Sequence, residues 1–340
     1  MTRAPLPLAD RHGRVATDLR VSVTDRCNLR CAYCMPADGL PWIPAPDLLT
    51  DQETMRLVRI AVTRLGVTQV RFTGGEPLLR QGLVEIIAAT AALTPRPAIS
   101  LTTNGIGLAR LAAPLRAAGL DRVNISLDTL DPARFKALTR RDRLSDVLTG
   151  IAAAQTAGLN PVKLNAVIQR GANTRDILPL LDFALAHGYQ LRYIEHMPLD
   201  SGHTWTHEGT VSAGEIRAEI ETRYVLKPDP AHRGGAPAET YLIPGHHAAD
   251  GRTARVGIIA SVTEPFCAAC ERTRRTAEGT VRSCLFSHHE TDLRTALRDG
   301  ASDEDLAHSW AQAMRGKPAA HGIGTSGFRQ PQRTMSAIGG

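Results

Sequence analysis

Aromatic residues and long hydrophobic runs are both scarce in this chain of 340 residues. Phe, Trp and Tyr make up 4% of the sequence, which weakens the hypothesis of a nucleic-acid-binding protein that stacks bases on aromatic rings. No run of about 18 apolar residues occurs, because the longest candidate, residues 83–93, contains Glu85 and Thr90. We therefore expect no membrane-spanning helix and no membrane partner. Residues 1–14 lack the apolar stretch of a signal peptide, so we expect a cytoplasmic protein.

Cysteine is absent outside two short clusters that lie far apart in the sequence. The first triplet is Cys27, Cys31 and Cys34, and the second triplet is Cys267, Cys270 and Cys284. A large chain without a secretion signal does not need disulfides, so thiols that bind metal are the better interpretation.

Short β-rich runs alternate with helical patterns over the first two-thirds of the chain. The expected strands are 19–23, 67–73, 98–103, 122–127, 162–168 and 190–195, and the expected helices are 51–65, 79–93, 108–118, 144–157 and 175–187. Thr50 and Glu53 form a capping-box signal for the first helix. Such alternation predicts a parallel sheet with right-handed crossovers. The expected fold is α/β, an incomplete (βα)6 TIM-like barrel that is two units short of the complete barrel.

The composition of the sequence changes near Pro228, where the segment PDPAHRGGAP is rich in turn-forming residues. Two apolar runs follow, residues 239–243 and 254–262, and the turn residues between them predict a hairpin. A helical pattern covers residues 302–314. We therefore expect a barrel domain over residues 15–228 and an α+β extension over residues 229–340 that carries the second triplet.

The first triplet has the spacing C-x3-C-x2-C and lies in a loop directly after the first expected strand. Zinc would need a fourth ligand, and the nearest upstream histidine is His12. Three thiolates on a four-iron cluster leave one iron open to a small molecule. The spacing thus favours an iron–sulfur cluster over a zinc knuckle.

The second triplet has the spacing C-x2-C-x13-C. His288 or His289 could complete a zinc site here, so the zinc interpretation is stronger than for the first triplet. Arg272, Arg274 and Arg275 lie in the same loop. Three arginines beside an open metal site suit a polyanionic substrate, although a solvated basic face is the alternative.

Several motifs taken together resemble a known family. They are LRVSVTDRCNLRCAYCMP, RFTGGEPLLR, LTTNG, VNISLDTL, RYIEHMP, FCAACERTR and the terminal SAIGG. The first motif resembles the radical S-adenosylmethionine (SAM) superfamily. The whole set, from about Asp18 to Gly340, resembles the GTP 3′,8-cyclase family, whose members begin molybdenum-cofactor biosynthesis.

The resemblance implies roles for individual residues. It implies that the first triplet holds a 4Fe–4S cluster that binds SAM, and that the second triplet holds another 4Fe–4S cluster whose open iron takes the guanine. The implied SAM contacts are Tyr33, Gly75, Ser126 and Met197. The implied GTP contacts are Arg20, Arg71, Thr102, Lys163, Arg272, Thr273 and Arg274. The tail Gly339–Gly340 is implied to enter the active site.

The implied activity is that of a lyase, which cyclises GTP to 3′,8-cyclo-7,8-dihydro-GTP with SAM as the source of the radical. The resemblance also implies a homodimer, a reductant protein of unknown identity and a downstream cyclic pyranopterin monophosphate synthase. Two residues depart from the family pattern, since we expect a neutral polar residue at Glu271 and an aliphatic one at Arg275. A carboxylate near a cluster could lower its reduction potential, and Arg275 could offset it as an ion pair.

Two other hypotheses remain. The first is a different two-cluster radical SAM enzyme that acts on a peptide, which would not need the arginine set. The second is a zinc-stabilised nucleic-acid-binding protein, which the low aromatic content and the lack of a long basic stripe disfavour.

Overall fold

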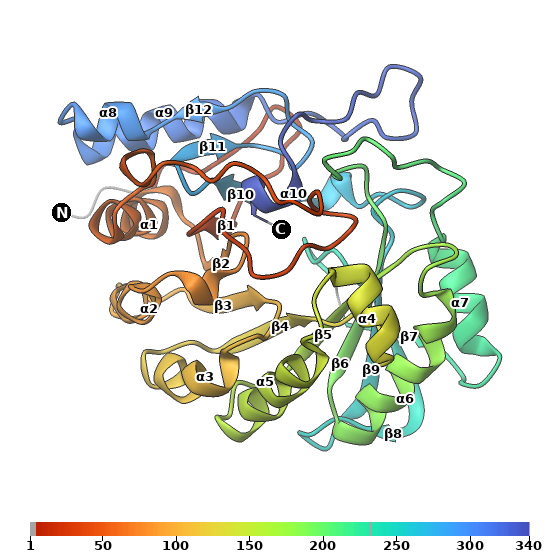
Figure 1. The fold of residues 1–340 in the computed structure, drawn as a ribbon. Coiled ribbons are helices and arrows are strands. Elements are labelled where there is room, and N and C mark those ends of the chain that lie inside the picture. Colours follow the sequence, from red (N-terminus) through yellow and green to blue (C-terminus); the bar gives the residue numbers. More distant parts are fainter. Residues whose placement is uncertain (1–4, 232, 340) are drawn as a thin grey trace.

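The structure, a computed structural model, describes residues 5–231 and 233–339. Its strands form one sheet of twelve strands in the order β12-β11-β10-β1-β2-β3-β4-β5-β6-β9-β8-β7. The sheet curves into an open arc, and helices α1, α2, α3, α5 and α6 cover its outer side (Figure 1).

The central six strands are parallel to one another and confirm the six expected strands to within two residues at each end. They are β1 (Asp18–Ser22), β2 (Gln69–Thr73), β3 (Ala98–Thr103), β4 (Arg122–Ser126), β5 (Lys163–Ile168) and β6 (Gln190–Glu195). The fold is therefore the expected incomplete α/β barrel.

The crossover helices confirm the predicted pattern with two adjustments. They are α1 (Asp51–Leu65), α2 (Leu83–Ala91), α3 (Leu108–Ala117), α4 (Pro132–Thr139), α5 (Leu144–Thr156) and α6 (Ile177–His187). The Thr50 capping box of α1 is present, with the Thr50 side chain and Glu53 bonding each other's backbone N–H. Helix α2 begins four residues later than predicted, because Pro77 opens a 3-10 turn, η2 (Pro77–Leu79), before it. Helix α4 is additional.

The chain after residue 226 joins both edges of this sheet. On one edge β9 (Thr253–Ile259) runs parallel to β6 and forms the expected hairpin with β8 (Glu239–His247), which pairs with β7 (Lys227–Pro228). On the other edge β10 (Arg272–Arg275) runs parallel to β1, followed by β11 (Thr280–Arg282) and β12 (Thr291–Asp292). The remaining helices are α7 (Ala213–Glu221), α8 (Arg294–Arg298), α9 (Asp303–Arg315) and α10 (Met335–Ile338). The second triplet is thereby brought beside β1.

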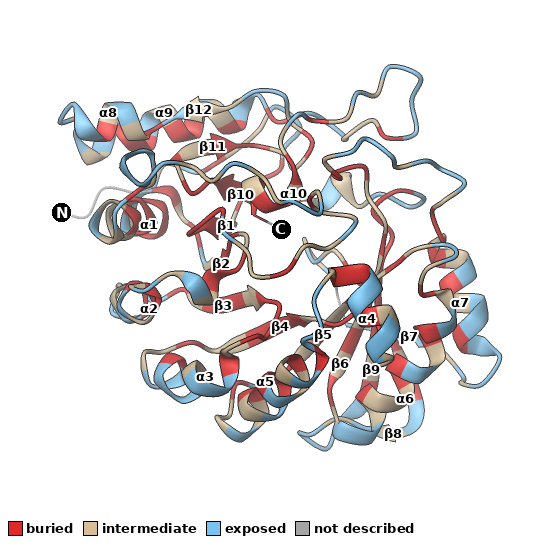
Figure 2. Cartoon of the chain, in the orientation of Figure 1, coloured by how far each residue is buried: buried red, intermediate tan, exposed pale blue. Residues whose placement is uncertain are grey.

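The sheet has an apolar outer face and a polar inner face. On β1, Leu19 and Val21 are fully buried in the hydrophobic core, whereas Arg20 between them lines an inner cavity. Arg71 on β2 and Arg192 on β6 occupy equivalent inward positions. The strands of the arc are coloured mostly as buried, while the outer helices expose their far sides (Figure 2). The interior of a closed barrel is filled by apolar side chains. Here the inner side of the sheet carries polar residues around a cavity, which suits a polar ligand.

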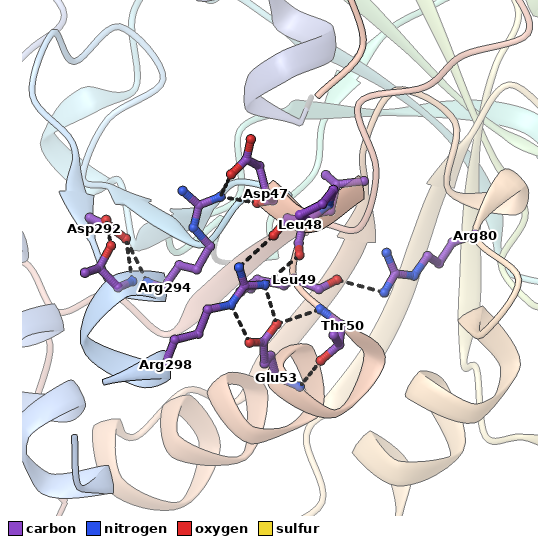
Figure 3. A network of polar contacts seen from close by, with 11 residues as sticks. Asp47, Leu48, Leu49, Thr50, Glu53, Arg80, Asp292, Arg294 and Arg298 are labelled. Atoms are coloured by element: carbon purple, nitrogen blue, oxygen red, sulfur yellow. Dashed lines mark hydrogen bonds and ion pairs between the residues drawn. The ribbon is translucent and has the colours of Figure 1, made fainter. Parts of the chain in front are cut away.

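Helix α8 ties the C-terminal region to the segment between the first triplet and α1 (Figure 3). Arg298 pairs with Glu53 through Nε and Oε1 at 2.8 Å and donates to the Leu48 carbonyl at 3.0 Å. Arg80 donates to the Leu49 carbonyl from the other side at 2.9 Å. Residues of the C-terminal region therefore help to hold the segment that links the first triplet to α1. Among the described residues, no helix has the length and apolar character needed to cross a lipid bilayer.

Candidate functional site

Two cavities adjoin each other on the inner side of the arc. The first-triplet cavity has an open volume of about 1120 Å³ and the second-triplet cavity one of about 980 Å³, both including space open to solvent. They share the walls Thr102, Asn165, Ile194, Met197 and Met335. Because each triplet lines its own cavity, ligands bound at the two triplets would lie side by side.

Most of the predicted site residues line one of these cavities. The first-triplet cavity contains Cys27, Cys31, Cys34, Tyr33, Gly75, Ser126, Met197 and Thr102. The second-triplet cavity contains Cys267, Cys270, Cys284, Arg20, Arg71, Thr102, Arg272 and Arg274. The expected SAM contacts and most expected GTP contacts are thus gathered at separate but touching positions.

The loop of the first triplet follows β1 and is braced by α4. The backbone N–H groups of Arg30 and Ala32 donate to the carbonyls of Thr139 and Leu138, both at 2.9 Å. Arg140, just after α4, donates to the Met35 carbonyl at 2.8 Å. The helix that the sequence analysis missed therefore fixes the shape of the cysteine loop.

Burial favours the protonated form of the three thiols of the first triplet. Burial raises the pKa of Cys27 to about 12 and that of Cys34 to about 11, and it raises the pKa of Cys31 well above its ordinary value. Metals bind the thiolate form, so occupation of this site releases protons.

Both triplets fit thiolate ligation of iron–sulfur clusters. All six cysteines are free thiols of intermediate exposure, and each triplet shares one cavity. Within residues 5–231 and 233–339, no three His, Cys, Asp or Glu side chains gather closely enough to share a single metal ion. The thiolates of a cluster bind different irons and stand further apart than the ligands of one ion. Each triplet could therefore supply three thiolates to a 4Fe–4S cluster.

Glycines after β2 pack against the chain that leads into the first triplet. The Gly75 N–H donates to the Thr24 carbonyl at 2.7 Å. A Cβ at Gly74 would lie 2.5 Å from that same carbonyl, and a Cβ at Gly75 would collide with the carbonyls of Asp25 and Arg26. Only glycine fits at these two positions, and both glycines leave bare backbone along the cavity.

A carboxylate that the sequence analysis missed lies beside the first triplet. The Tyr33 hydroxyl donates to Asp128 Oδ2 at 2.7 Å, and the Val167 N–H donates to Asp128 Oδ1 at 2.8 Å. Burial raises the pKa of Asp128 to about 6. Asp128 follows β4 by two residues, at the strand end where the site lies, and that position is the signal that could have identified it.

The second-triplet cavity is strongly cationic. Arg20, Arg71, Arg192, Arg272 and Arg274 all line it. Burial, reinforced by the charge of Arg20, lowers the pKa of Arg192 and of Arg274 to about 9. In the described part of the chain, Nε of Arg71 and both Nε and Nη2 of Arg272 are buried without a hydrogen-bond partner. Unpaired buried donors of one charge suit a polyanion that would satisfy them.

Arg192 was not predicted as a site residue. Its Nε donates to Asn165 Oδ1 at 2.9 Å and its Nη2 donates to Asn124 Oδ1 at 2.7 Å. The strand QLRYIE places this arginine between two buried residues, Leu191 and Tyr193. Period-two alternation on this strand was therefore the available signal.

Two predicted GTP contacts lie apart from the lining of the cavity. Thr273 is fully buried on the outer face of β10, where its hydroxyl accepts from Trp310 Nε1 at 2.9 Å. Lys163 begins β5 two residues before Asn165, on the inward side. Burial lowers the pKa of Lys163 to about 7, and the neighbouring charge of Arg192 adds to the effect. A role in GTP binding remains a prediction for both residues.

Helix α10 and the C-terminus lie on the inner side of the arc (Figure 1). Arg274 Nη1 donates to the Gly339 carbonyl at 2.7 Å in a buried position. Met335 lines both cavities and Ser336 lines the first-triplet cavity. The tail does enter the candidate site as far as Gly339, while Gly340 falls outside the described residues.

Two cations hold the loop of the second triplet from behind. Lys317 Nζ donates to the carbonyls of Cys270 and Arg272 at 2.7 and 2.8 Å. Arg14 Nη1 donates to the Cys267 carbonyl at 2.6 Å. Burial raises the pKa of the Cys270 thiol, but Lys317 and Arg272 outweigh it and the net shift is downward. The loop therefore favours a thiolate at this position.

The histidine that lines the second-triplet cavity is one that the sequence analysis did not consider. His288 and His289 are both exposed, and the His288 ring bonds the Arg329 carbonyl at 3.1 Å. His321, in the loop after α9, lines the cavity together with the second triplet.

The expected ion pair between Glu271 and Arg275 is wrong. The Glu271 carboxylate accepts from the Thr17 hydroxyl at 3.1 Å, whereas Arg275 is fully buried and donates to the Ser22 carbonyl at 3.3 Å. Four residues along an extended strand separate the two backbones by about 13 Å, so their side chains meet different neighbours.

Comparisons with known proteins identify the family. The chain matches the Radical SAM superfamily over residues 21–184 and the Molybdenum Cofactor Synthesis C family over residues 189–323. It is 59% identical to a GTP 3′,8-cyclase from Mycobacterium marinum over 98% of this chain and 92% of that protein. It is 60% identical to a GTP 3′,8-cyclase from Streptomyces coelicolor over 98% of this chain and 96% of that protein.

The fold has a counterpart among solved structures. The crystal structure of Streptococcus suis SuiB covers 92% of this chain and 69% of its own, with a TM-score of 0.56 and 17% sequence identity, which supports likeness of fold alone. The radical SAM match implies SAM and a 4Fe–4S cluster as cofactors. On the strength of the two full-length relatives, the chain belongs to the GTP 3′,8-cyclase family.

Proposed function

We propose that this protein is a GTP 3′,8-cyclase, a lyase that cyclises GTP to 3′,8-cyclo-7,8-dihydro-GTP in the first step of molybdenum-cofactor biosynthesis. The observation that carries the proposal is the pair of adjoining cavities, each with its own thiol triplet, of which one is lined by arginines. A peptide-modifying enzyme would not need five arginines at its substrate site.

The barrel region, residues 15–228, holds the SAM half of the site. Cys27, Cys31 and Cys34 supply three thiolates to a 4Fe–4S cluster. When bound, the cluster and SAM would supply the radical chemistry that the cyclisation of GTP requires. Tyr33, Gly75, Ser126 and Met197 surround the remaining space and orient the SAM molecule.

Residues 229–340 complete the GTP half of the site. The second triplet would supply three thiolates to a second 4Fe–4S cluster, which would offer a site for the guanine in the same cavity. Arg20, Arg71, Arg272 and Arg274 bind the triphosphate. A charged hydrogen bond contributes about 1.5–3 kcal/mol, so the phosphates anchor the nucleotide, although the contributions add less than linearly.

The shared walls of the cavities explain how the two ligands meet. Thr102, Asn165 and Met197 each line both cavities, so the SAM and the nucleotide are separated by single side chains. Reactive groups held about 3–3.5 Å apart react far faster than free ones. Met197 and Met335 add apolar side chains to the wall that the two cavities share.

We also infer a homodimer, a cytoplasmic location, an electron-donor protein and a downstream cyclic pyranopterin monophosphate synthase. The resemblance to the family supports these four inferences.

An oxygen-free reaction tests the proposal directly. Protein with reconstituted clusters is incubated with GTP, SAM and dithionite, and the products are analysed by mass spectrometry. We expect consumption of GTP and a product of the same mass as GTP, together with 5′-deoxyadenosine and methionine. An unreacted GTP pool in the presence of SAM cleavage would favour the peptide-modifying alternative. Zinc without acid-labile sulfide would favour the nucleic-acid-binding one.

Replacing Arg71 by methionine is expected to weaken GTP binding by about 13- to 150-fold, the equivalent of one charged hydrogen bond. Methionine keeps much of the volume but removes a buried cation whose Nε has no partner in the described structure. The melting temperature should therefore not fall. Anaerobic calorimetry with GTP and a thermal scan measure both quantities. Arg141→Met removes the same charge from an exposed site and serves as the control. An unchanged dissociation constant of GTP in Arg71→Met would contradict a role of Arg71 in binding the phosphates.

Lys163 should take up a proton when GTP binds above neutral pH. Its pKa of about 7 leaves it mostly neutral at pH 8, and a nearby phosphate favours the charged form and raises that pKa. GTP affinity should therefore fall as the pH rises through 7. Calorimetry at pH 8 in two buffers of different ionisation enthalpy should report uptake of about one proton. Lys163→Gln should abolish that uptake, and equal uptake in both proteins would show that the phosphates do not reach this residue.

A further inference from the structure

His321 lines the second-triplet cavity, and its ring nitrogen Nε2 is buried without a hydrogen-bond partner in the described part of the chain. The Ile323 N–H donates to His321 Nδ1 at 3.1 Å. Because Nδ1 accepts that bond, the ring carries its proton on Nε2.

The ring of His321 is held in place on several sides. The Phe286 ring meets it edge-on, with centroids 5.2 Å apart and an interplanar angle of 60°. The backbone N–H of His321 faces the Cys267 thiol. The Ser261 backbone interacts with the ring and opposes the lowering of the His321 pKa by burial, but no hydrogen bond of ordinary length and angle reaches Nε2. The donor is therefore fixed in direction and still available to a ligand.

The surroundings of His321 differ from those of the arginines. The Phe286 ring packs against His321, and the cavity wall also contains Ile259 and Leu285. The arginines come from β1, β2, β6 and β10. An apolar wall with one neutral donor suits a planar heterocycle, whereas the arginines suit phosphates.

We infer that His321 is a substrate-binding residue that donates a hydrogen bond from Nε2 to an acceptor on the purine base, O6 or N7. This inference rests on the proposed function, because it takes GTP as the ligand of this cavity. Guanine presents two acceptors on that edge, O6 and N7, whereas adenine replaces O6 with a donor amino group. A fixed donor here therefore favours guanine over adenine if it faces O6, and reads any purine if it faces N7.

Binding measurements on the cluster-loaded protein test the inference without recourse to turnover. Dissociation constants are measured anaerobically for GTP, 6-thio-GTP and 7-deaza-GTP, which weaken the acceptor at position 6 or remove the one at position 7. The variants are His321→Phe, which keeps a ring without the donor, and His321→Gln, whose side-chain amide can place a donor at a similar distance from the backbone. His288→Phe, at an exposed histidine, is the matched control.

We expect His321→Phe to weaken GTP binding about three- to tenfold, the worth of one neutral hydrogen bond. His321→Gln and His288→Phe should stay within about twofold of the original protein. For one of the two analogues, the dissociation constant from the unmodified protein should equal the dissociation constant of GTP from His321→Phe. The same analogue should bind His321→Phe no more weakly than it binds the unmodified protein. That analogue identifies the acceptor atom.

Other outcomes overturn the inference. Equal losses for GTP and both analogues in His321→Phe would show a structural role only, as would the same loss in His321→Gln. A measurement of iron content shows whether His321→Phe has lost its second cluster. In that case the dissociation constants of the two analogues from His321→Gln and from the unmodified protein test the inference instead. Failure of the unmodified protein to bind GTP at all would overturn the proposed function and this inference together, whereas unchanged GTP binding in His321→Phe would overturn this inference alone.

Discussion

Cys267→Ser is expected to abolish the cyclised product while SAM cleavage continues, whereas Cys31→Ser is expected to abolish both. The two cysteines line different cavities, and only the cavity of Cys31 also contains Tyr33 and Gly75, the proposed SAM contacts. Serine is a poor ligand for iron–sulfur clusters, so each substitution should empty one site. The loss of product should exceed about a hundredfold, because a misplaced substrate forfeits the advantage of proximity.

The measurement separates the two half-reactions. 5′-Deoxyadenosine reports SAM cleavage and the cyclised nucleotide reports the complete reaction, both by mass spectrometry from one anaerobic sample. Iron per chain should fall by about half in each variant. Equal loss of SAM cleavage in the two variants would contradict separate roles for the triplets.

Local patterns predicted the central barrel because its elements depend on neighbours in sequence. The strand 98–103 and the helix 51–65 were placed without error, since β-rich runs, periodicity and the Thr50 cap all lie within one segment. Helices α4 and α7 were missed because each is shorter than three turns and its periodicity is weak. Both carried a visible start signal: Asp131 before Pro132 for α4, and Ser212 with Glu215 for α7.

The pairing of distant segments could not be read from the sequence. Arg20 of β1 stands opposite Arg274 of β10, and no local pattern records a partner so far along the chain. That pairing helps to bring the second triplet to the barrel. The prediction of a Glu271–Arg275 ion pair failed for a related reason, because closeness in sequence was taken for contact without allowing for the extended strand between them.

The residues of the candidate site also differ in whether a local sequence pattern marks them. The cysteines were predicted because ligand spacing is a local property. Asp128 and Arg192 were missed although the end of β4 and the alternation along β6 marked them, whereas His321 acquires its place from the fold. His321 follows α9 in a loop rich in glycine, where nothing in the sequence directs its ring toward the second triplet.

Gly339→Ala is expected to reduce product formation more strongly than any other single-methyl change in the tail. Gly339 has a φ of 86°, in the left-handed region that side chains disfavour. An added Cβ would lie 2.9 Å from Ser22 Cβ and 3.0 Å from Thr73 Cγ2. Such strain costs on the order of 1–3 kcal/mol, which corresponds to about a 5- to 150-fold shift toward a displaced tail.

Displacement of the tail would reach both halves of the site. The Gly339 carbonyl would leave Arg274, a proposed phosphate ligand, and Met335 would withdraw from the wall between the cavities. Ser336 would move away from Cys34, so it would no longer oppose the raising of the Cys34 pKa by burial. We therefore expect the rate of product formation to fall by about the same factor, with little change in the melting temperature, because only the short helix α10 depends on this turn.

Gly324→Ala provides the matched control, since nothing lies within 4 Å of a Cβ there. It adds one methyl group to the same C-terminal region without strain. Product rate, GTP binding and melting temperature are compared for the two variants under anaerobic conditions. Equal rates in Gly339→Ala and Gly324→Ala would show that the tail does not need its buried position for turnover. A lower rate in Gly339→Ala alone would tie the reaction to the turn that places the tail between the two cavities.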